Sequence, residues 1–314
     1  MEEIITKRRN KLNLTNIEGF WLTGRYPLKH FHQAVSFQPR MGDVFVAGYP
    51  KSGTTWTQYI VWDILHYGAP LPSVNEIWTK EFTHLEMIGT DNLIDLPSPR
   101  LLKVNMPFHY TPYHPDAKYI YVYRNPWDNC VSGFNHYRQV EKKNYSDATF
   151  EEFFQSFMQG EVSQGDYFDH ILSWYDQKDK PNIYFLSYER MKMDPGKAIL
   201  NIARFLGEEY YENLINDNQL FENIFRNVQF DQMKKNCPLY FITSLNDGMK
   251  KSNEKLNFFS KGVVGQWKEY FTEDQKIKMQ LKCQRKFRGT ELLSSWNGFD
   301  IPSLESNLSS NVKF

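Results

Sequence analysis

The stretch that most constrains the fold of this chain lies early in the sequence. Four apolar residues, Val44–Ala47, precede the segment Gly48-Tyr-Pro-Lys-Ser-Gly-Thr-Thr-Trp56, and a helix-like apolar run continues to Leu65. This order predicts a strand, a tight loop and a helix. Such a loop directs backbone N–H groups and the positive end of the helix dipole at one point, where Lys51 adds a full charge. The stretch therefore predicts a site for a phosphate or sulfate group.

The loop departs from the nucleotide-triphosphatase pattern G-x-x-x-x-G-K-[ST]. Gly48 and Gly53 have the required spacing, but Thr54 stands where the lysine belongs, and Lys51 lies inside the loop. No clear acidic strand end follows, and no metal-ligand cluster is visible, so no metal is expected. A kinase that uses a nucleoside triphosphate is therefore the least favoured of three hypotheses.

Short apolar runs alternate with helix-like stretches along most of the chain. The expected strands are Val44–Ala47, Leu101–Val104, Tyr119–Tyr123 and Ile183–Leu186, and the expected helices are 54–66, about 126–139, 149–158, 163–177 and about 195–206. This alternation predicts an α/β fold with a central parallel sheet and helices on both of its faces. We expect a single domain over 1–314, with 1–40 as an N-terminal lid or edge segment and 295–314 as a polar tail. Residues 207–260 are expected to be less regular.

Ligands of parallel sheets bind beyond the carboxyl ends of the strands. Four segments lie at the carboxyl ends of expected strands: the loop 48–55, Lys103–Asn105, Arg124 and Ser187–Tyr188. We therefore expect these four segments to converge on one pocket.

Composition limits the partners and the location. The 314 residues are 41% hydrophobic, which is enough for a large core, and Lys+Arg and Asp+Glu both number 37. With no net charge, the anion site must be local, and binding to nucleic acid or to acidic membranes is not favoured. Three widely spaced cysteines, Cys130, Cys237 and Cys283, argue against a disulfide framework or a zinc knuckle. The sequence lacks a signal peptide core and an apolar run of roughly 18 residues, so a soluble, cytoplasmic protein is expected.

Five segments resemble, in the same order, those of the cytosolic sulfotransferases, which use 3′-phosphoadenosine 5′-phosphosulfate as sulfuryl donor. These segments are Tyr49–Trp56, Tyr121–Ser132, Phe157–Ser163, Ser187–Met191 and Lys261–Trp267. The similarity runs from about Ser36 to Phe271, which is most of the chain. It implies an enzyme of small-molecule metabolism that releases 3′-phosphoadenosine 5′-phosphate.

The resemblance also implies which residues bind the donor. They are Lys51, Ser52, Gly53, Thr54, Thr55, Trp56, Arg124, Ser132, Tyr188, Val228, Gln229, Phe230, Met233, Phe259, Ser260, Lys261 and Gly262. By similarity, the first loop would cradle the phosphosulfate, Arg124 and Ser132 would hold the 3′-phosphate, and Phe230 would pack against the adenine. The implied catalytic residues are Lys51, Lys103, Asn105 and Ser132.

The chain departs from the family pattern at several of these positions. Asn105 stands where the family has the histidine that acts as general base, and an amide has no useful basicity. Ser260 stands where the family usually has an arginine, and Val228 replaces a hydroxyl-bearing residue. The dimer signature is degraded, with Ile277 in place of its final Glu, so we expect a monomer or a weak homodimer.

Two main hypotheses follow. In the first, Lys51 and Lys103 stabilise charge while the oxygen or nitrogen of a small apolar or aromatic acceptor (a phenol, alcohol or amine) attacks the sulfur. His84, His109, His114 and His136 are the candidates to replace the missing base. The expected acceptor pocket comprises Phe20, Phe31, Trp78, Phe82, Asn105, Phe134 and Tyr240. In the second hypothesis, the chain is a catalytically impaired pseudoenzyme that binds 3′-phosphoadenosine nucleotides or a small aromatic ligand.

Overall fold

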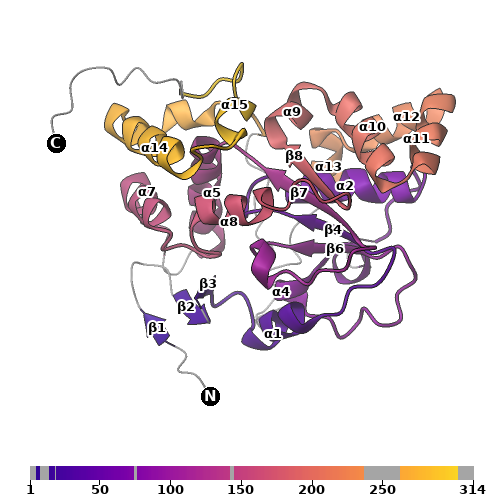
Figure 1. Cartoon of the computed structure of the whole chain (residues 1–314), viewed down its shortest axis with the longest axis horizontal. Coiled ribbons are helices and arrows are strands. Elements are labelled where there is room, and N and C mark those ends of the chain that lie inside the picture. Colours follow the sequence, from indigo (N-terminus) through magenta and orange to yellow (C-terminus); the bar gives the residue numbers. More distant parts are fainter. Residues whose placement is uncertain are drawn as a thin grey trace.

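The fold is built around a parallel sheet of five strands. The computed structural model describes residues 5–7, 14–17, 19–73, 76–141, 145–236 and 262–302. The strand order is β5-β6-β4-β7-β8, with every neighbouring pair parallel (Figure 1). The bounds are β4 Val44–Ala47, β5 Thr83–His84, β6 Leu101–Val104, β7 Lys118–Tyr123 and β8 Ile183–Ser187. The predicted parallel sheet is confirmed, and the two-residue strand β5 is added at its edge.

Helices cover both faces of this sheet, as predicted. Alternate residues of β4 belong to two separate cores, because Val44 and Val46 pack on one face and Phe45 and Ala47 on the other. Figure 1 shows the two groups of helices on either side. On the Val44 side lie α2 Thr54–Leu65, α10 Pro195–Leu206, α11 Glu208–Asn216 and α12 Asn218–Asn227, and on the Phe45 side lie α5 Pro126–Val140, α7 Phe150–Gln159, α8 Tyr167–Tyr175 and α14 Glu273–Lys286.

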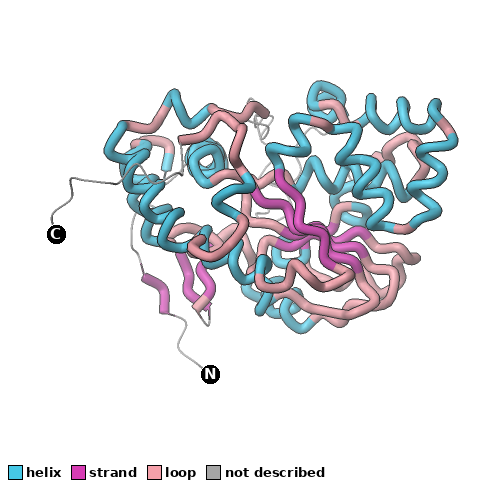
Figure 2. The backbone as a smooth tube through the Cα atoms, turned by 45° about the horizontal axis from the view of Figure 1, so that its top comes forward, coloured by secondary structure: helices cyan, strands magenta, loops and turns pink. Residues whose placement is uncertain are grey.

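The first forty residues contain a second, smaller sheet. Strands β1 Ile5–Lys7, β2 Leu14–Ile17 and β3 Phe20–Thr23 pair antiparallel, and Figure 2 shows them apart from the central sheet. Helix α1 Leu28–Ser36 follows and packs against α4 Leu85–Ile88, which comes directly after β5. The N-terminal segment therefore approaches the same end of the fold as β5.

The expectation of an irregular stretch after residue 207 is wrong for 208–236. This stretch forms α11, α12 and α13 Phe230–Asn236. A capping signal was present in the sequence, because the Asp217 side chain accepts a hydrogen bond from the backbone N–H of Leu220 at 3.0 Å and so begins α12. Residues 237–261 lie outside the described part of the chain.

The remaining short elements connect these layers. They are η1 Ile77–Glu81, η2 Phe108–Tyr110, α9 Tyr188–Met193, η3 Gln266–Glu269 and α15 Leu292–Ser295. Within the described residues, none of the helices combines the length and the apolar character that crossing a bilayer requires.

Candidate functional site

The predicted anion-binding loop connects the carboxyl end of β4 to the start of α2. Two of its residues, Lys51 and Gly53, have φ angles of 70° and 108°, which turn the chain sharply into the helix. The N-cap residue Gly53 has no side chain that could occupy the N–H groups in the first turn of α2. The helix therefore offers these groups to an oxyanion.

Gly53 also allows the loop to lie directly against α9. A Cβ atom added to Gly53 would lie 2.6 Å from the ring of Tyr188, which is closer than a side chain tolerates. The loop and the tyrosine ring thus enclose one wall of a cavity. Thr54, Thr55 and Trp56 from the first turn of α2 line the same cavity.

Three cations from three strand ends line this cavity together. Lys51 follows β4, Lys103 lies on β6, and Arg124 follows β7. Burial, together with the positive charges of Lys103 and Arg124, lowers the pKa of Lys51 to about 7. An anion among these side chains would relieve their repulsion. The predicted convergence of the strand ends is confirmed, since the residues after β4, β6, β7 and β8 meet here.

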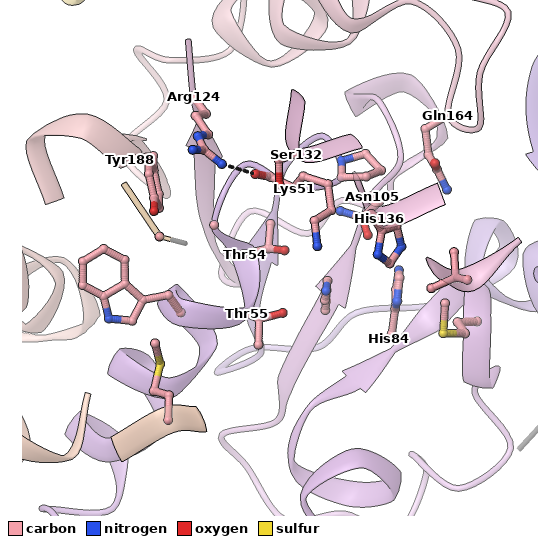
Figure 3. Close-up of a pocket in the computed structure, with 18 of the residues that line it drawn as sticks. Lys51, Thr54, Thr55, His84, Asn105, Arg124, Ser132, His136, Gln164 and Tyr188 are labelled. Carbon is pink, nitrogen blue, oxygen red and sulfur yellow. Dashed lines mark hydrogen bonds between the residues drawn. The ribbon is translucent and has the colours of Figure 1, made fainter. Parts of the chain in front are cut away.

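One end of the cavity is built around Arg124 and Tyr188 (Figure 3). The guanidinium carbon lies 4.5 Å from the centroid of the Tyr188 ring, and Nη2 donates to the carbonyl oxygen of Val263 at 3.1 Å. Val263 belongs to a second glycine-bearing loop, residues 262–267. Asp128 of α5 holds this loop in place, because its carboxylate accepts hydrogen bonds from the backbone N–H groups of Gly265 and Trp267 at 2.9 and 3.0 Å. Among the described residues, Arg124 Nε has no hydrogen-bond partner, so this guanidinium retains a donor for an anion.

Aromatic side chains from α2 and α13 extend this end of the cavity. Trp56 Nε1 donates to the carbonyl oxygen of Val228 at 2.9 Å, so the buried Val228 positions the indole without lining the cavity itself. Phe230 lines the cavity with Gln229 and Met233, and a Cβ on Gly262 would lie 2.9 Å from its ring. The two rings and the second loop form an enclosure that a flat heterocycle would fit.

The opposite end of the cavity has a different character. Figure 3 shows His84, His136 and Gln164 at this end, with Lys51 and Asn105 between it and Arg124. Tyr26 lies beside His84 with ring centroids 6.0 Å apart, and Tyr137 lies beside His136. Thr23, Arg25, Met87, Ile88 and Val140 also line the cavity. The cavity therefore joins a cationic end to an end that mixes imidazoles, phenols and apolar groups.

Asn105 lies at the junction of the two ends and is held on three sides. Its side-chain Nδ2 donates to the carbonyl oxygen of Gly48, and its backbone N–H donates to the carboxylate of Glu86. Its carbonyl oxygen lies 3.1 Å from Nε2 of His170, whose Nδ1 lies 2.9 Å from the Tyr121 hydroxyl. Burial lowers the pKa of His170 to about 3, so this imidazole is neutral. Asn105 thus joins the end of β6 to the loop after β4.

Some predicted site residues lie elsewhere. Phe20, Phe31, Phe82 and Phe134 do not line this cavity and are buried in the two cores, where Phe20 stacks on Phe31 with centroids 5.4 Å apart. Ser52 is buried and accepts a hydrogen bond from Asn129. The side chain of Trp78 is not described, and Tyr240, Phe259, Ser260 and Lys261 lie outside the described residues. The remaining predicted residues that line the cavity are Lys51, Gly53, Thr54, Thr55, Trp56, Lys103, Asn105, Arg124, Ser132, Tyr188, Gln229, Phe230, Met233 and Gly262.

Several lining residues were not expected from the sequence. Arg25 and Tyr26 come from the segment between β3 and α1, and Gln164 comes from the loop before α8. No motif marks these residues, because they reach the cavity through packing of segments far apart in the chain. His84 and His136 had a sequence signal only as members of a set of four histidines.

Comparison with known proteins finds that the sequence and the fold are similar to those of sulfotransferases. A family model described as the sulfotransferase domain matches residues 41–291. The chain is 32% identical over 290 residues to mouse sulfotransferase 1B1, with 89% of this chain and 94% of that protein covered. The chain is 33% identical over 290 residues to dog sulfotransferase 1B1, with 89% of this chain and 95% of that protein covered. The crystal structure of mouse sulfotransferase SULT7A1 complexed with PAP matches with a TM-score of 0.70 and 27% identity, over 88% of this chain and 95% of that chain.

Proposed function

Because this chain belongs to the sulfotransferase family, we propose that it transfers a sulfuryl group from 3′-phosphoadenosine 5′-phosphosulfate to a hydroxyl or amine of a small acceptor. The observation that carries the proposal is the group of cations Lys51, Lys103 and Arg124, which line the cavity beside the uncapped first turn of α2. A cavity with this much positive charge is complementary to a ligand that bears several phosphate or sulfate oxygens.

The donor residues divide by chemistry. Lys51 and the first turn of α2 are proposed to hold the phosphosulfate, where their charge and N–H groups stabilise oxygens that become more negative during transfer. Arg124 and Ser132 are proposed to hold the 3′-phosphate, and Trp56 and Phe230 to enclose the adenine. The mouse relative that was solved with PAP supports this class of ligand for the family. When bound, the donor supplies the activated sulfuryl group, and the chain supplies orientation and charge.

The acceptor is proposed to bind at the end of the cavity that contains His84, His136 and Gln164. Met87 and Ile88 provide apolar contacts there, and Tyr26 and Tyr137 provide phenolic ones. This mixture suits a small acceptor with an apolar or aromatic body and one polar group. Lys103 is close enough to lower the pKa of Lys51 as well as those of His84 and His136, so it is proposed to stabilise the sulfuryl group as it moves.

Transfer from ³⁵S-labelled donor to a panel of phenols, alcohols and amines tests the proposal. We expect a labelled product with at least one acceptor class, and we expect Lys51→Ala to abolish it. Arg124→Ala is expected to weaken binding of 3′-phosphoadenosine 5′-phosphate, measured by calorimetry. Unchanged affinity in Arg124→Ala would mean that the 3′-phosphate is bound elsewhere, and steady hydrolysis of ATP with magnesium would favour the kinase alternative.

Asn105 supports a second candidate function, that of a nucleotide-binding pseudoenzyme. Loss of a general base typically slows a reaction by about 10²–10⁴-fold, and an amide cannot replace it. The two functions differ in one measurement. The pseudoenzyme binds 3′-phosphoadenosine 5′-phosphate but transfers no label to any acceptor, whereas the enzyme does both.

A further inference from the structure

Two imidazoles line the cavity beside Lys103 and Asn105. They belong to His84, at the end of β5, and His136, on α5. The other histidines considered from the sequence, His109 and His114, do not line it. Within the described part of the chain, the histidine candidates for a proton acceptor at this site are therefore reduced to two.

His84 is paired with a buried carboxylate. Its Nε2 lies 3.0 Å from Oε1 of Glu86, whose side chain is fully buried. A hydrogen on Nε2 is favoured in this position, because a lone pair there would face the negative charge of Glu86. The lone pair is then on Nδ1, which can accept a proton. The resulting imidazolium would form a buried ion pair with Glu86.

The charged neighbours of His136 are positive, in contrast to the negative Glu86 beside His84. Burial lowers the pKa of His136 well below its ordinary value, and the positive charges of Lys51, Arg25 and Lys103 lower it further. Burial also lowers the pKa of His84, and the positive charge of Lys103 adds to this effect, but Glu86 opposes both. Protonation of His136 would add one more positive charge to a group of cations, whereas protonation of His84 would neutralise an anion.

The hydrogen-bonding groups of Asn105 are used to hold neighbouring segments in place. Its side-chain amide donates to Gly48 in the phosphosulfate loop, and its backbone N–H donates to the same Glu86 that faces His84. Glu86 thus connects Asn105 to the imidazole. The side-chain amide keeps the loop in place and the backbone N–H holds the carboxylate, so a neighbouring side chain is needed to take the proton.

We propose that His84, oriented by Glu86, is the general base for the acceptor. This inference rests on the proposed sulfotransferase activity. As a lone pair of the acceptor oxygen forms the new bond to sulfur, the proton of its hydroxyl passes to Nδ1 of His84. The bond between sulfur and the bridging oxygen breaks, and its electron pair stays on the 5′-phosphate, which leaves as part of 3′-phosphoadenosine 5′-phosphate.

A series of para-substituted phenols tests this role, because the members share one shape and differ in acidity. For 4-methylphenol, which ionises least readily, His84→Gln is expected to lower kcat/KM by about 10²–10⁴-fold. For 4-nitrophenol, which ionises readily, the loss is expected to be much smaller. The ratio of parent to variant should therefore rise steadily with the pKa of the phenol.

Two matched variants accompany this measurement. His109→Gln changes an exposed histidine outside the cavity and is expected to leave the rates unchanged. His136→Gln is expected to give a ratio that does not depend on the acidity of the phenol. An acidity-dependent loss in His136→Gln, or a loss in His84→Gln that is equal for all phenols, would overturn the proposal.

Failure of the proposed function has a different signature. If the parent binds 3′-phosphoadenosine 5′-phosphate but transfers nothing, the absorbance of 4-nitrophenol in that complex still tests His84. Below the pKa of the free phenol, the parent should hold a larger fraction of bound phenolate than His84→Gln does. Equal fractions would exclude His84 as the proton acceptor, with or without turnover.

Glu86 acts through His84 and is a positioning residue. The charged and titratable groups around His84 are Glu86, Lys103, Tyr26 and His136. Glu86→Gln removes the negative charge that stabilises the imidazolium, so the pKa of His84 is expected to fall. The acid limb of the pH profile of kcat/KM should therefore move to lower pH. Binding of 3′-phosphoadenosine 5′-phosphate serves as the control for folding. A variant that binds this nucleotide normally but keeps the parent's acid limb would show that Glu86 has only a structural role.

Discussion

At the scale of single residues, the site depends on charges that the fold holds close together against their own repulsion. Lys51 illustrates this, because burial and the nearby charges of Lys103 and Arg124 lower its pKa to about 7. A lysine in this state is about half charged near neutral pH. An anionic ligand that favours the charged form will therefore couple its binding to proton uptake.

We expect binding of 3′-phosphoadenosine 5′-phosphate at pH 8 to take up about one proton through Lys51. Above the free pKa of Lys51 the amine is mostly neutral, and the bound phosphates raise that pKa, so the affinity falls as pH rises. Below it the amine is already charged, and this uptake disappears. Calorimetry in buffers of different ionisation enthalpy measures the proton count. Lys51→Met should lose the uptake, and an unchanged count in that variant would assign the proton to another group.

At the scale of secondary-structure elements, the junction between the phosphosulfate loop and α2 is packed against α9. Gly53→Ala is expected to weaken binding of 3′-phosphoadenosine 5′-phosphate, because the new Cβ would lie 2.6 Å from the Tyr188 ring and displace a wall of the cavity. Gly289→Ala is the matched control, since Gly289 also has a positive φ, 79°, but has nothing within 4 Å of its Cβ position. Both variants should lose stability. Equal nucleotide affinity in the two would show that contact with Tyr188 does not shape the site.

The opposite end of the sheet contains the link between β4 and β6. Arg100 donates to both carboxylate oxygens of the buried Asp43 at 2.7 and 2.6 Å and to the carbonyl oxygen of Leu93 at 3.0 Å. Arg100→Met is expected to lower the free energy of unfolding by about 3–5 kcal/mol, because it leaves a buried carboxylate without its partner. Urea denaturation measures this change.

An exposed ion pair provides the control for that experiment. Lys29 and Asp91 are 2.9 Å apart, but their side chains are 69% and 64% exposed. Lys29→Met is therefore expected to change the free energy of unfolding by only about 0–1 kcal/mol. Similar losses in Lys29→Met and Arg100→Met would mean that burial of the Asp43 pair contributes little to stability.

The sequence predicted the elements whose signal is local. Val44–Ala47 is a continuous apolar run, and Leu101–Val104 is apolar except for Lys103, as expected of strands buried on both faces, and the structure confirms both strands. Strand β5 was missed because two residues, Thr83 and His84, are too short to show a period. Helix α12 was missed because its many polar residues obscured the capping signal at Asp217.

The site was predictable to the same limited extent. Lys51 and Arg124 follow predicted strands, and Lys103 lies near the carboxyl end of one, and a parallel sheet brings such positions to one edge. Arg25 and Gln164 belong to loops, so only tertiary packing places them in the cavity. The aromatic residues proposed for the acceptor pocket, such as Phe82, were chosen by type. Apolarity alone does not distinguish a pocket wall from a core, and the two cores contain Phe20, Phe31, Phe82 and Phe134.

At the scale of the whole molecule, the proposed donor site connects parts of the fold that belong to different cores. Its lining comes from the loop after β4, from β6, from the segment after β7, and from α5, α9 and α13. A ligand that contacts all of these parts binds the folded chain and not the unfolded one. Its affinity therefore adds directly to the free energy of unfolding.

This coupling distinguishes two nucleotides that differ by one phosphate. At a concentration of 100 times its Kd, 3′-phosphoadenosine 5′-phosphate is expected to raise the free energy of unfolding by about 2.7 kcal/mol. Adenosine 5′-phosphate at the same concentration should stabilise the chain far less, because it lacks the group proposed to bind Arg124 and Ser132. Thermal unfolding with each nucleotide measures the difference. In Arg124→Ala the two nucleotides should stabilise the chain to nearly the same extent, because the 3′-phosphate then loses its charged partner. If the two nucleotides still differ in stabilisation as much as they do with the parent, the 3′-phosphate is recognised outside this end of the cavity.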